Sequence, residues 1–324
     1  MERRDFLASL AALRLAANLD AQTSSGMIYR NLGTTGQRVS AMGLGGYHMG
    51  VPREESESIR LVRSSVDRGI TFLDNSCDYH EGGSEIRMGK ALKEGYRQRA
   101  FLMTKFNGRT RAMAAKQIDE SLRRLQTDMI DLIQLHENIR MEDPDRFFAR
   151  GGAIEAVLAA KQAGKVRFIG FTGHKDPSIH LKMLDVAAQH KFHFDACQMP
   201  LNVLDYHFRS FSHQVVPRLV KEGIAVLGMK PLGSASIPRA GLATATECLH
   251  YALNLPTSVV ITGCDSMERL DQAFDAARTF KPLSQQQLQA LVGKTKEAAM
   301  TGKLELFKTS TQFDGTTRDP QSMG

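Results

Sequence analysis

IDLIQL at residues 130–135, with FLMTK before it at 101–105 and ITFLD at 70–74, is the stretch that decides the fold. Each run is almost continuously apolar, which is typical of a strand buried on both faces. Helical patterns separate the runs, at about 83–94 and 111–125. A repeated strand, helix and strand predicts right-handed crossovers in a parallel sheet.

The same alternation continues on both sides of this stretch. Further strand-like runs lie at residues 41–45, 166–171, 194–198, 224–228 and 258–262. Helical patterns follow at about 54–68, 150–163, 176–190, 211–222, 242–253 and 266–277. Eight such units predict an α/β fold, the closed (β/α)8 TIM barrel. The competing doubly wound sheet that binds dinucleotides needs a GxGxxG turn, and GLGGYHMG at 43–50 lacks that spacing.

The ends of the barrel sequence carry two additions. Residues 28–39 (IYRNLGTTGQRV) predict an N-terminal β-hairpin with Gly33 and Gly36 near its turn. A C-terminal tail begins at Pro282, with one more helix and a polar, irregular end that either crosses the barrel mouth or stays loose. Barrels often run to about 250 residues or more as one domain. We therefore expect residues 27–324 to form a single barrel domain.

The N-terminal segment, MERRDFLASLAALRLAANLDAQ, is set apart from the barrel. Adjacent Arg3 and Arg4 precede Phe-Leu and an alanine- and leucine-rich stretch, a pattern typical of a twin-arginine (Tat) export signal. Arg14 interrupts the apolar run, so a frayed or disordered N-terminus is the alternative. Residues 1–26 thus predict periplasmic export with the Tat machinery as a partner. A disordered segment would instead leave the protein in the cytoplasm.

Composition excludes several classes of protein. The net charge of +7 comes from 42 basic and 35 acidic residues that form no like-charged run, so a nucleic-acid partner is not expected. No run of about 18 apolar residues is present to span a membrane. The cysteines have no CxxC spacing and no accompanying histidine cluster, so we expect neither a disulfide nor a metal site; they are Cys77, Cys197, Cys248 and Cys264.

Ionisable residues follow three neighbouring strands where chemistry is usually placed in this fold, at the carboxyl ends. The second strand ends in Asp74, the third in Lys105, and His136 follows the fourth. Tyr79 lies five residues beyond Asp74, in the loop after the second strand. These four groups should converge on one sector of the barrel rim.

The motifs around these residues resemble those of the aldo-keto reductase family. FLDNSCDYHEGGSEIRMGKAL (72–92), FLMTK (101–105) and SLRRLQTDMIDLIQLHE (121–137) match its ordered signatures, and the similarity extends over about residues 28–280. The resemblance implies an NAD(P)H-dependent oxidoreductase that reduces an aldehyde or ketone to an alcohol by hydride transfer.

The resemblance also implies catalytic roles. Tyr79 would donate the proton, Lys105 would favour its phenolate, and Asp74 would hold Lys105. His136 would orient the substrate oxygen. Each residue has a structural alternative, such as a buried ion pair or a pocket-wall tyrosine, but the four together favour catalysis.

Cofactor binding is expected at the loops after the seventh and eighth strands. Asp265 or Ser266 would cap the next helix and leave backbone N–H groups for a phosphate. The resemblance assigns Arg269 to the 2′-phosphate, which favours NADPH over NADH, although it could instead be a surface arginine paired with a helix acid. It assigns Gln198 to the nicotinamide carboxamide.

Several positions depart from the family pattern. Thr172-Gly173 replaces the usual Ser-Asn, Met229 replaces the aromatic residue that covers the nicotinamide, and Gly263 replaces a lysine. Lys230 either reaches a phosphate or points to solvent. The predicted cofactor contacts are Thr172, Gln198, Met229, Lys230, Leu232, Gly263, Ser266 and Arg269.

The substrate is less constrained than the reaction. His80, Glu81 and Glu137 beside the catalytic residues favour sugar-like or small polar carbonyl compounds. Two other functions remain open: a non-enzymatic nicotinamide-binding sensor or docking protein, and a barrel isomerase or lyase that uses Lys105 as a Schiff-base amine.

Overall fold

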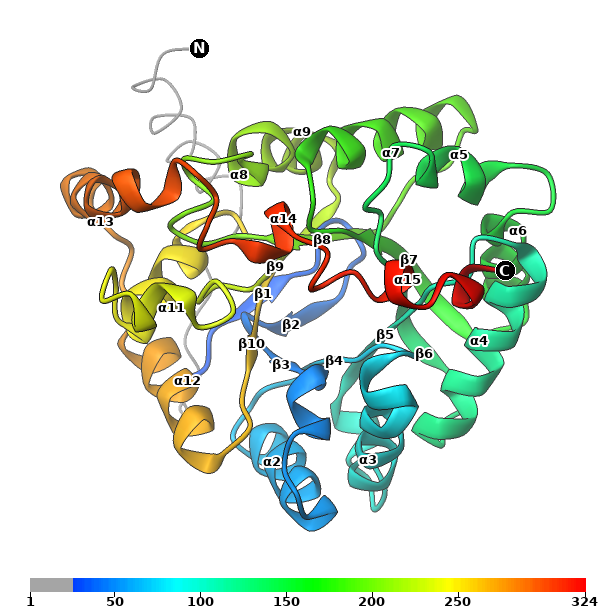
Figure 1. Ribbon diagram of the computed structural model, residues 1–324. Helices are drawn as coiled ribbons and strands as arrows, with labels where there is room; N and C mark the ends of the chain where they lie inside the picture. The colour runs from blue at the N-terminus through cyan, green and yellow to red at the C-terminus, as the bar shows by residue number, and fades with distance from the viewer. Residues whose placement is uncertain (1–25) are drawn as a thin grey trace.

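The computed structural model describes residues 26–324. Eight parallel strands close into a barrel in the order β10-β3-β4-β5-β6-β7-β8-β9, with helices around the outside (Figure 1). The barrel strands are β3 (Met42–Gly45), β4 (Phe72–Asp74), β5 (Phe101–Phe106), β6 (Ile130–Leu135), β7 (Val166–Thr172), β8 (Ala196–Pro200), β9 (Ala225–Met229) and β10 (Val259–Gly263). The predicted (β/α)8 TIM barrel is confirmed.

One principal helix follows each strand. These helices are α2 (Glu55–Asp67), α3 (Gly83–Ala91), α4 (Arg111–Leu125), α6 (Ala153–Gln162), α7 (Pro177–Gln189), α9 (Val216–Glu222), α11 (Ala245–Asn254) and α12 (Met267–Thr279). Loops carry the shorter helices η1 (Gly46–Gly50), η2 (Tyr79–Gly82), η3 (Arg97–Arg99), α5 (Asp143–Phe148), α8 (Phe211–Gln214) and α10 (Ser236–Arg239).

Two helices differ from the sequence prediction. The helix expected at 150–163 begins only at Ala153, after α5 and a turn in which Gly151 has φ +74°. The helix expected at 211–222 divides at Val215 into α8 and α9. Pro217 has no N–H to donate to the preceding turn, which accounts for the break.

The N-terminal hairpin closes one end of the barrel. Strands β1 (Tyr29–Asn31) and β2 (Arg38–Ser40) pair antiparallel, as predicted. Leu32 and Val39 are buried in the same cluster as the barrel-interior side chains, among them the stacked Phe72 and Phe101. A Cβ at Gly33, which has φ +52°, would lie 2.6 Å from the Gly223 carbonyl oxygen, so the close approach requires glycine. The hairpin leaves the carboxyl ends of the strands to form the pocket.

The C-terminal tail crosses the opposite end of the barrel instead of staying loose. It consists of α13 (Gln285–Ala299), α14 (Leu306–Thr309), α15 (Gly315–Arg318) and η4 (Pro320–Met323), drawn in orange and red in Figure 1. The backbone N–H of Arg109 donates to the Met323 carbonyl at 2.7 Å. Buried Lys308 pairs with Asp205 at 2.8 Å. These contacts hold the tail across this end of the barrel, where other residues of the tail line the pocket.

Other expectations from composition concern the described residues only. Between residues 26 and 324, no helix is long and apolar enough to cross a bilayer, and no three potential ligand side chains gather for a metal ion. The four cysteines are buried and unbonded to one another. The predicted export segment lies, through residue 25, outside the described residues.

Candidate active site

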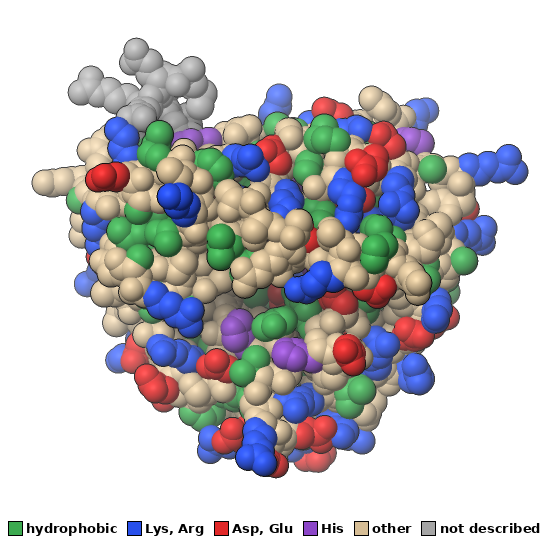
Figure 2. Space-filling model, in the orientation of Figure 1, with side chains coloured by type: hydrophobic (Ala, Val, Ile, Leu, Met, Phe, Trp, Pro, Cys, Tyr) green, Lys and Arg blue, Asp and Glu red, His purple; other side chains and the backbone are tan. Residues whose placement is uncertain are grey.

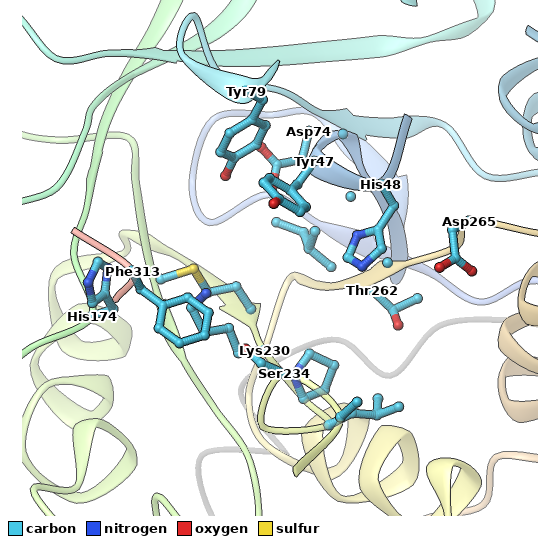
Figure 3. Close-up of a pocket in the computed structure, with 18 of the residues that line it drawn as sticks. Tyr47, His48, Asp74, Tyr79, His174, Lys230, Ser234, Thr262, Asp265 and Phe313 are labelled. Atoms are coloured by element: carbon cyan, nitrogen blue, oxygen red, sulfur yellow. The ribbon is translucent and has the colours of Figure 1, made fainter. Parts of the chain in front are cut away.

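A cavity of about 1050 Å³ opens at the carboxyl ends of the barrel strands. A hollow with histidine and basic side chains beside it is visible on this face (Figure 2). All four predicted catalytic residues line it: Asp74, Tyr79, Lys105 and His136. Figure 3 shows Tyr79 on one side of the cavity, with Lys230 and Phe313 on the opposite side.

Asp74, Lys105 and Tyr79 form one connected group. The buried Lys105 ammonium pairs with Asp74 Oδ1 and donates to the Asn75 carbonyl at 2.7 Å. Its Nζ also lies 3.2 Å from Tyr79 Oη. The pair is formed because Asp74 ends β4 beside Met103 of the neighbouring strand β5, and Lys105 lies two residues further along β5, near its carboxyl end. Lys105 is thus aimed at the tyrosine hydroxyl by a buried counter-ion.

The protonation of Tyr79 in the free protein is set mainly by burial. Burial raises the pKa of Tyr79 well above its usual value, and the nearby Asp74 carboxylate raises it further. Lys105 Nζ, 3.2 Å from Oη, acts against these two effects and would stabilise a phenolate once the proton has left. Tyr79 is therefore held as a neutral phenol, the form that can donate a proton.

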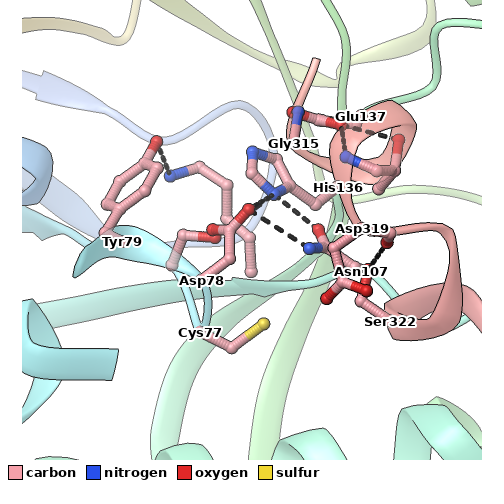
Figure 4. Close-up of polar contacts among 12 residues, drawn as sticks. Cys77, Asp78, Tyr79, Asn107, His136, Glu137, Gly315, Asp319 and Ser322 are labelled. Carbon is pink, nitrogen blue, oxygen red and sulfur yellow. Dashed lines mark hydrogen bonds and ion pairs between the residues drawn. The ribbon is translucent and has the colours of Figure 1, made fainter. Parts of the chain in front are cut away.

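His136 is fixed through its Nδ1 atom. This nitrogen lies 2.8 Å from Asn107 Oδ1 and 3.2 Å from Ser76 Oγ, and Asn107 Nδ2 donates to Asp78 Oδ2 at 3.1 Å (Figure 4). Burial lowers the pKa of His136, against the opposing effect of the Asp78 carboxylate. The ring is therefore neutral near pH 7. Its centroid lies 6.1 Å from that of Tyr79.

The loop after Tyr79 has an unusual backbone. His80 and Glu81 have φ values of 51° and 57°, and Gly82 follows with φ +86°. Consecutive left-handed residues other than glycine are costly, at about 1–3 kcal/mol each. His80 Nε2 lies 2.9 Å from the Tyr47 carbonyl oxygen and its ring packs on that of Tyr47. The loop is thereby held so that Tyr79 enters the cavity.

Six of the eight predicted cofactor contacts line the cavity: Thr172, Met229, Lys230, Leu232, Gly263 and Arg269. Gln198 and Ser266 do not. Gln198 is buried and donates to Asp74 Oδ2 at 3.2 Å. Ser266 caps α12 by accepting from the Arg269 N–H at 3.3 Å. Ser266, and not Asp265, is the capping residue.

Lys230 is an unpaired cation within the part of the chain that the structure describes. Its ammonium lies 4.7 Å from the centroid of Phe313 and 5.4 Å from that of Phe307, both in the tail. Burial lowers its pKa to about 8, with the Glu137 carboxylate acting in the opposite direction. Desolvated cations are costly unless an anion compensates them. An anionic ligand would therefore bind favourably near Lys230.

Two glycines stand where members of the family usually have larger side chains, and both lie in crowded positions. A Cβ at Gly173 would lie 2.3 Å from the Asn138 carbonyl oxygen, and one at Gly263 would lie 2.0 Å from the His48 ring. An asparagine at 173 therefore does not fit this backbone, and His48 occupies the space of a side chain at 263. The donor set nevertheless fits a nicotinamide dinucleotide, because Lys230, Arg269 and Thr172 face one cavity.

Polar residues predicted to contact substrate are placed differently. His80 and Glu81 are exposed and are not part of the cavity lining. Glu137 lines the cavity, but its carboxylate accepts the Gly315 and Thr316 N–H groups at 2.7 Å. The Glu137 carboxylate therefore binds the backbone of the tail and holds the tail over the pocket.

Several lining residues were not found from the sequence. They are Tyr47 and His48 after β3 and Gln312, Phe313 and Arg318 in the tail. The aromatic pair follows the first barrel strand in GLGGYHMG, so its place at a strand end was a usable signal. The tail residues approach the site from about 180 positions away in the chain, and no local pattern indicates this contact.

A barrel with an Asp, Tyr, Lys and His set beside a cavity that fits a dinucleotide defines a class, the oxidoreductases that use a nicotinamide cofactor. The sequence identifies the family within this class. The chain matches the model of the aldo/keto reductase family over residues 41–246 and belongs to that family.

Individual relatives agree with this assignment. Aldo-keto reductase YhdN of Bacillus subtilis is 35% identical over 159 residues, 44% of this chain and 46% of that protein. L-galactose dehydrogenase of Arabidopsis thaliana is 28% identical over 80% of this chain and 90% of its own length. Aldo-keto reductase AKR11C1 from Bacillus halodurans, in its holo form, superposes with a TM-score of 0.70 at 25% identity, over 86% of this chain and 99% of that one.

Proposed function

We propose that this protein is an NADPH-dependent reductase that converts an aldehyde or ketone to an alcohol, with Tyr79 as the proton donor. The observation that carries the proposal is the contact of 3.2 Å between Lys105 Nζ and the neutral Tyr79 hydroxyl, within the cavity that His136 also lines. NADH is the alternative cofactor. When bound, the cofactor supplies a hydride to the carbonyl carbon.

The side chains of the protein would complete the reaction. As the carbonyl carbon is reduced, the electron pair of the C=O bond moves to oxygen, which takes the proton of Tyr79. An alkoxide is a far stronger base than a phenolate, so a phenol with a raised pKa still donates. Lys105, held by Asp74, is 3.2 Å from the oxygen on which the negative charge then develops. A solvent proton restores the phenol.

The cofactor would occupy the side of the cavity formed by β7, β9 and β10. Arg269 and the amino end of α12 offer positive charge for the adenosine phosphate. Lys230 offers a cation nearer the reacting centre, and Met229 a thioether to cover the nicotinamide. A Klebsiella pneumoniae aldo/keto reductase described in complex with NADP and acetate has the same fold, with a TM-score of 0.64 at 24% identity over 80% of this chain and 92% of that one.

We further propose a sugar-like or small polar carbonyl substrate. His48 and Arg318 give the cavity polar walls beside the apolar Phe313. The name of the L-galactose dehydrogenase, to which this chain is similar, supports the same substrate class. Turnover restricted to large apolar ketones would contradict this part of the proposal.

The direct test is cofactor oxidation, followed at 340 nm with NADPH and then NADH over a panel of aldehydes and ketones. Turnover with a lower KM for NADPH is expected. Cofactor binding without turnover would favour a sensor. Trapping of Lys105 by borohydride with a carbonyl substrate would favour a Schiff-base lyase.

We also propose that residues 1–26 direct export and that residues 27–324 are the exported catalytic unit. The support is the Arg3-Arg4 pattern before an apolar stretch. In a bacterium with a working Tat pathway, the full chain should reach the periplasm, and replacement of both arginines by lysine should retain it in the cytoplasm. A wild-type chain found in the cytoplasm alone would contradict export.

A further inference from the structure

We propose that Arg124 is a positioning residue for Tyr79, because its guanidinium supports both ends of the segment that carries the proton donor. This segment, the Tyr79 loop (residues 75–82), joins β4 to α3, whereas Arg124 belongs to α4 in the surrounding layer of helices. The inference rests on the proposed function for the role of Tyr79. It adds a residue that does not itself line the cavity.

The Tyr79 loop needs support because part of its backbone is strained. His80, Glu81 and Gly82 are consecutive left-handed residues, with φ values of 51°, 57° and 86°. Left-handed residues other than glycine persist only where the surrounding structure holds them in place. The contact of His80 with the Tyr47 carbonyl oxygen holds the loop from the side of the cavity, which Tyr47 lines. Arg124 holds it from the side of the helices.

Arg124 contacts the loop near both ends. Its Nη1 donates to the Cys77 carbonyl oxygen at 3.1 Å, two residues before Tyr79. Its guanidinium also lies against Gly82, where a Cβ would be 2.7 Å from Arg124 Cζ and Nε. Residues 78–81, with Tyr79 among them, therefore lie between two contacts with one planar group.

Carboxylates from two helices hold the guanidinium in turn. Glu85, in α3, is fully buried, and its Oε2 pairs with Arg124 Nη1 at 3.3 Å. Glu120, one turn earlier in α4, pairs with Nη2 at 3.3 Å. The other oxygen of Glu85 accepts from the Thr104 hydroxyl at 2.6 Å, and Thr104 directly precedes Lys105 in β5. The support of the Tyr79 loop is thus tied to the strand that carries the proposed catalytic lysine.

This arrangement fixes where the phenol oxygen lies. Lys105 Nζ is 3.2 Å from Tyr79 Oη, at the long end of the range for a hydrogen bond, so a small shift of the loop would break the contact. A misplacement of about 1 Å can cost about 100-fold in rate. Loss of Arg124 should therefore lower kcat through Tyr79 and leave cofactor affinity unchanged, because the proposed cofactor contacts lie on other strands.

The position of Tyr79 can be read without cofactor or turnover. The chain has six tyrosines, and in protein labelled with ¹³C at tyrosine Cζ the Tyr79 NMR signal is the one lost in Tyr79→Phe. We expect Arg124→Gln to shift or broaden that signal and to leave the signal of Tyr251, in α11, in place. Arg124→Lys keeps a cation beside Glu85 but lacks the planar fork, so a smaller change is expected. A Tyr79 signal unchanged in both variants would overturn the proposal.

The matched control is Arg123→Gln. Arg123 is the same residue type one position earlier in α4, and it is exposed. Its replacement removes the same charge from the end of the helix and should leave the Tyr79 signal and kcat at their wild-type values. An equal change in the control would attribute the effect to the helix and overturn the role of Arg124. If Arg124→Gln does not fold, Arg124→Lys decides the comparison.

A double-mutant cycle tests whether Arg124 acts through Tyr79. In steady-state carbonyl reduction with NADPH, Arg124→Lys should lower kcat about tenfold at unchanged NADPH affinity. In the Tyr79→Phe background it should lower kcat by about twofold or less, since no hydroxyl remains to be positioned. An equal loss in both backgrounds would indicate a general structural role and overturn the proposal. Full kcat in Tyr79→Phe would instead count against the proposed function, and the Tyr79 NMR signal would still decide whether Arg124 positions the ring.

Discussion

The two sides of the pocket, one with the proposed catalytic groups and one with the proposed cofactor contacts (the catalytic side and the cofactor side), are built differently. On the catalytic side, formed by β4, β5 and β6, Asp74, Lys105 and His136 each have a polar partner from a neighbouring strand or loop. On the cofactor side, and within residues 26–324, the Lys230 ammonium contacts the Phe313 ring without an ion pair, and the Arg269 guanidinium has a 3.5 Å contact with Gln272. The proposed catalytic groups are thus paired within the protein, whereas the cations proposed to bind the cofactor are available to an anionic ligand.

The largest effect is expected from a substitution that disrupts the catalytic side. Lys105→Met leaves the Asp74 carboxylate buried without its counter-ion, and removal of one partner of a buried pair costs about 3–5 kcal/mol. We expect the free energy of unfolding, measured with urea, to fall by that amount. The double variant Asp74→Asn/Lys105→Met should recover much of the loss, because no unpaired charge remains. A single variant as stable as the wild type would contradict the preassembly of this side.

The second expected effect concerns His180, whose ring contacts the backbone of β8. His180 is buried and its Nε2 lies 3.4 Å from the Gln198 carbonyl oxygen. Burial lowers its pKa to about 4 in the folded protein. The unfolded chain therefore binds more protons between pH 6.5 and 4, so stability is full above pH 6.5 and falls toward pH 4, by about 3 kcal/mol from this group.

His180→Gln should flatten that part of the stability curve in urea unfolding between pH 7.5 and 4.5. The exposed His193→Gln is the control. An unchanged slope in His180→Gln would show that another group causes the acid sensitivity.

The third effect concerns the departure from the family pattern at residue 173. Gly173→Asn restores the usual residue type but places a side chain against the Asn138 carbonyl oxygen. We expect destabilisation of about 1–3 kcal/mol from overpacking and no gain in cofactor affinity, measured by thermal unfolding and by NADPH titration. Tighter NADPH binding at unchanged stability would show that this side is more adaptable than its geometry indicates.

The smallest expected effect tests whether Arg269 contacts the 2′-phosphate of NADPH. Arg269→Gln should weaken NADPH binding about tenfold, the contribution of one charge-assisted hydrogen bond at an exposed site, and leave NADH binding unchanged. Fluorescence titration measures both affinities. Arg278→Gln, on the same helix and exposed, is the control. Equal weakening of NADPH and NADH would remove Arg269 from 2′-phosphate recognition.

The same comparison explains what the sequence could predict. The fold followed from strands and helices in strict alternation, and Asp74, Lys105 and His136 followed from the places where strands end. These are local signals. By contrast, the buried hydrogen bond of Gln198 to Asp74 depends on the far wall of the barrel, 124 residues away. The contact of the tail with Glu137 and the Asp78–Asn107–His136 chain likewise depend on packing between distant segments, which no short pattern records.

The central claim is that Tyr79 donates the proton, and one substitution tests it most directly. Wild type, Tyr79→Phe and the control Tyr47→Phe, whose ring lies 5.5 Å from that of Tyr79, would be compared in steady-state carbonyl reduction with NADPH. Cofactor affinity would be measured on the same samples. We expect Tyr79→Phe to bind NADPH as the wild type does and to lose at least about 100-fold in kcat, as for loss of a general acid. Turnover by Tyr79→Phe within a few-fold of the wild type would contradict the claim.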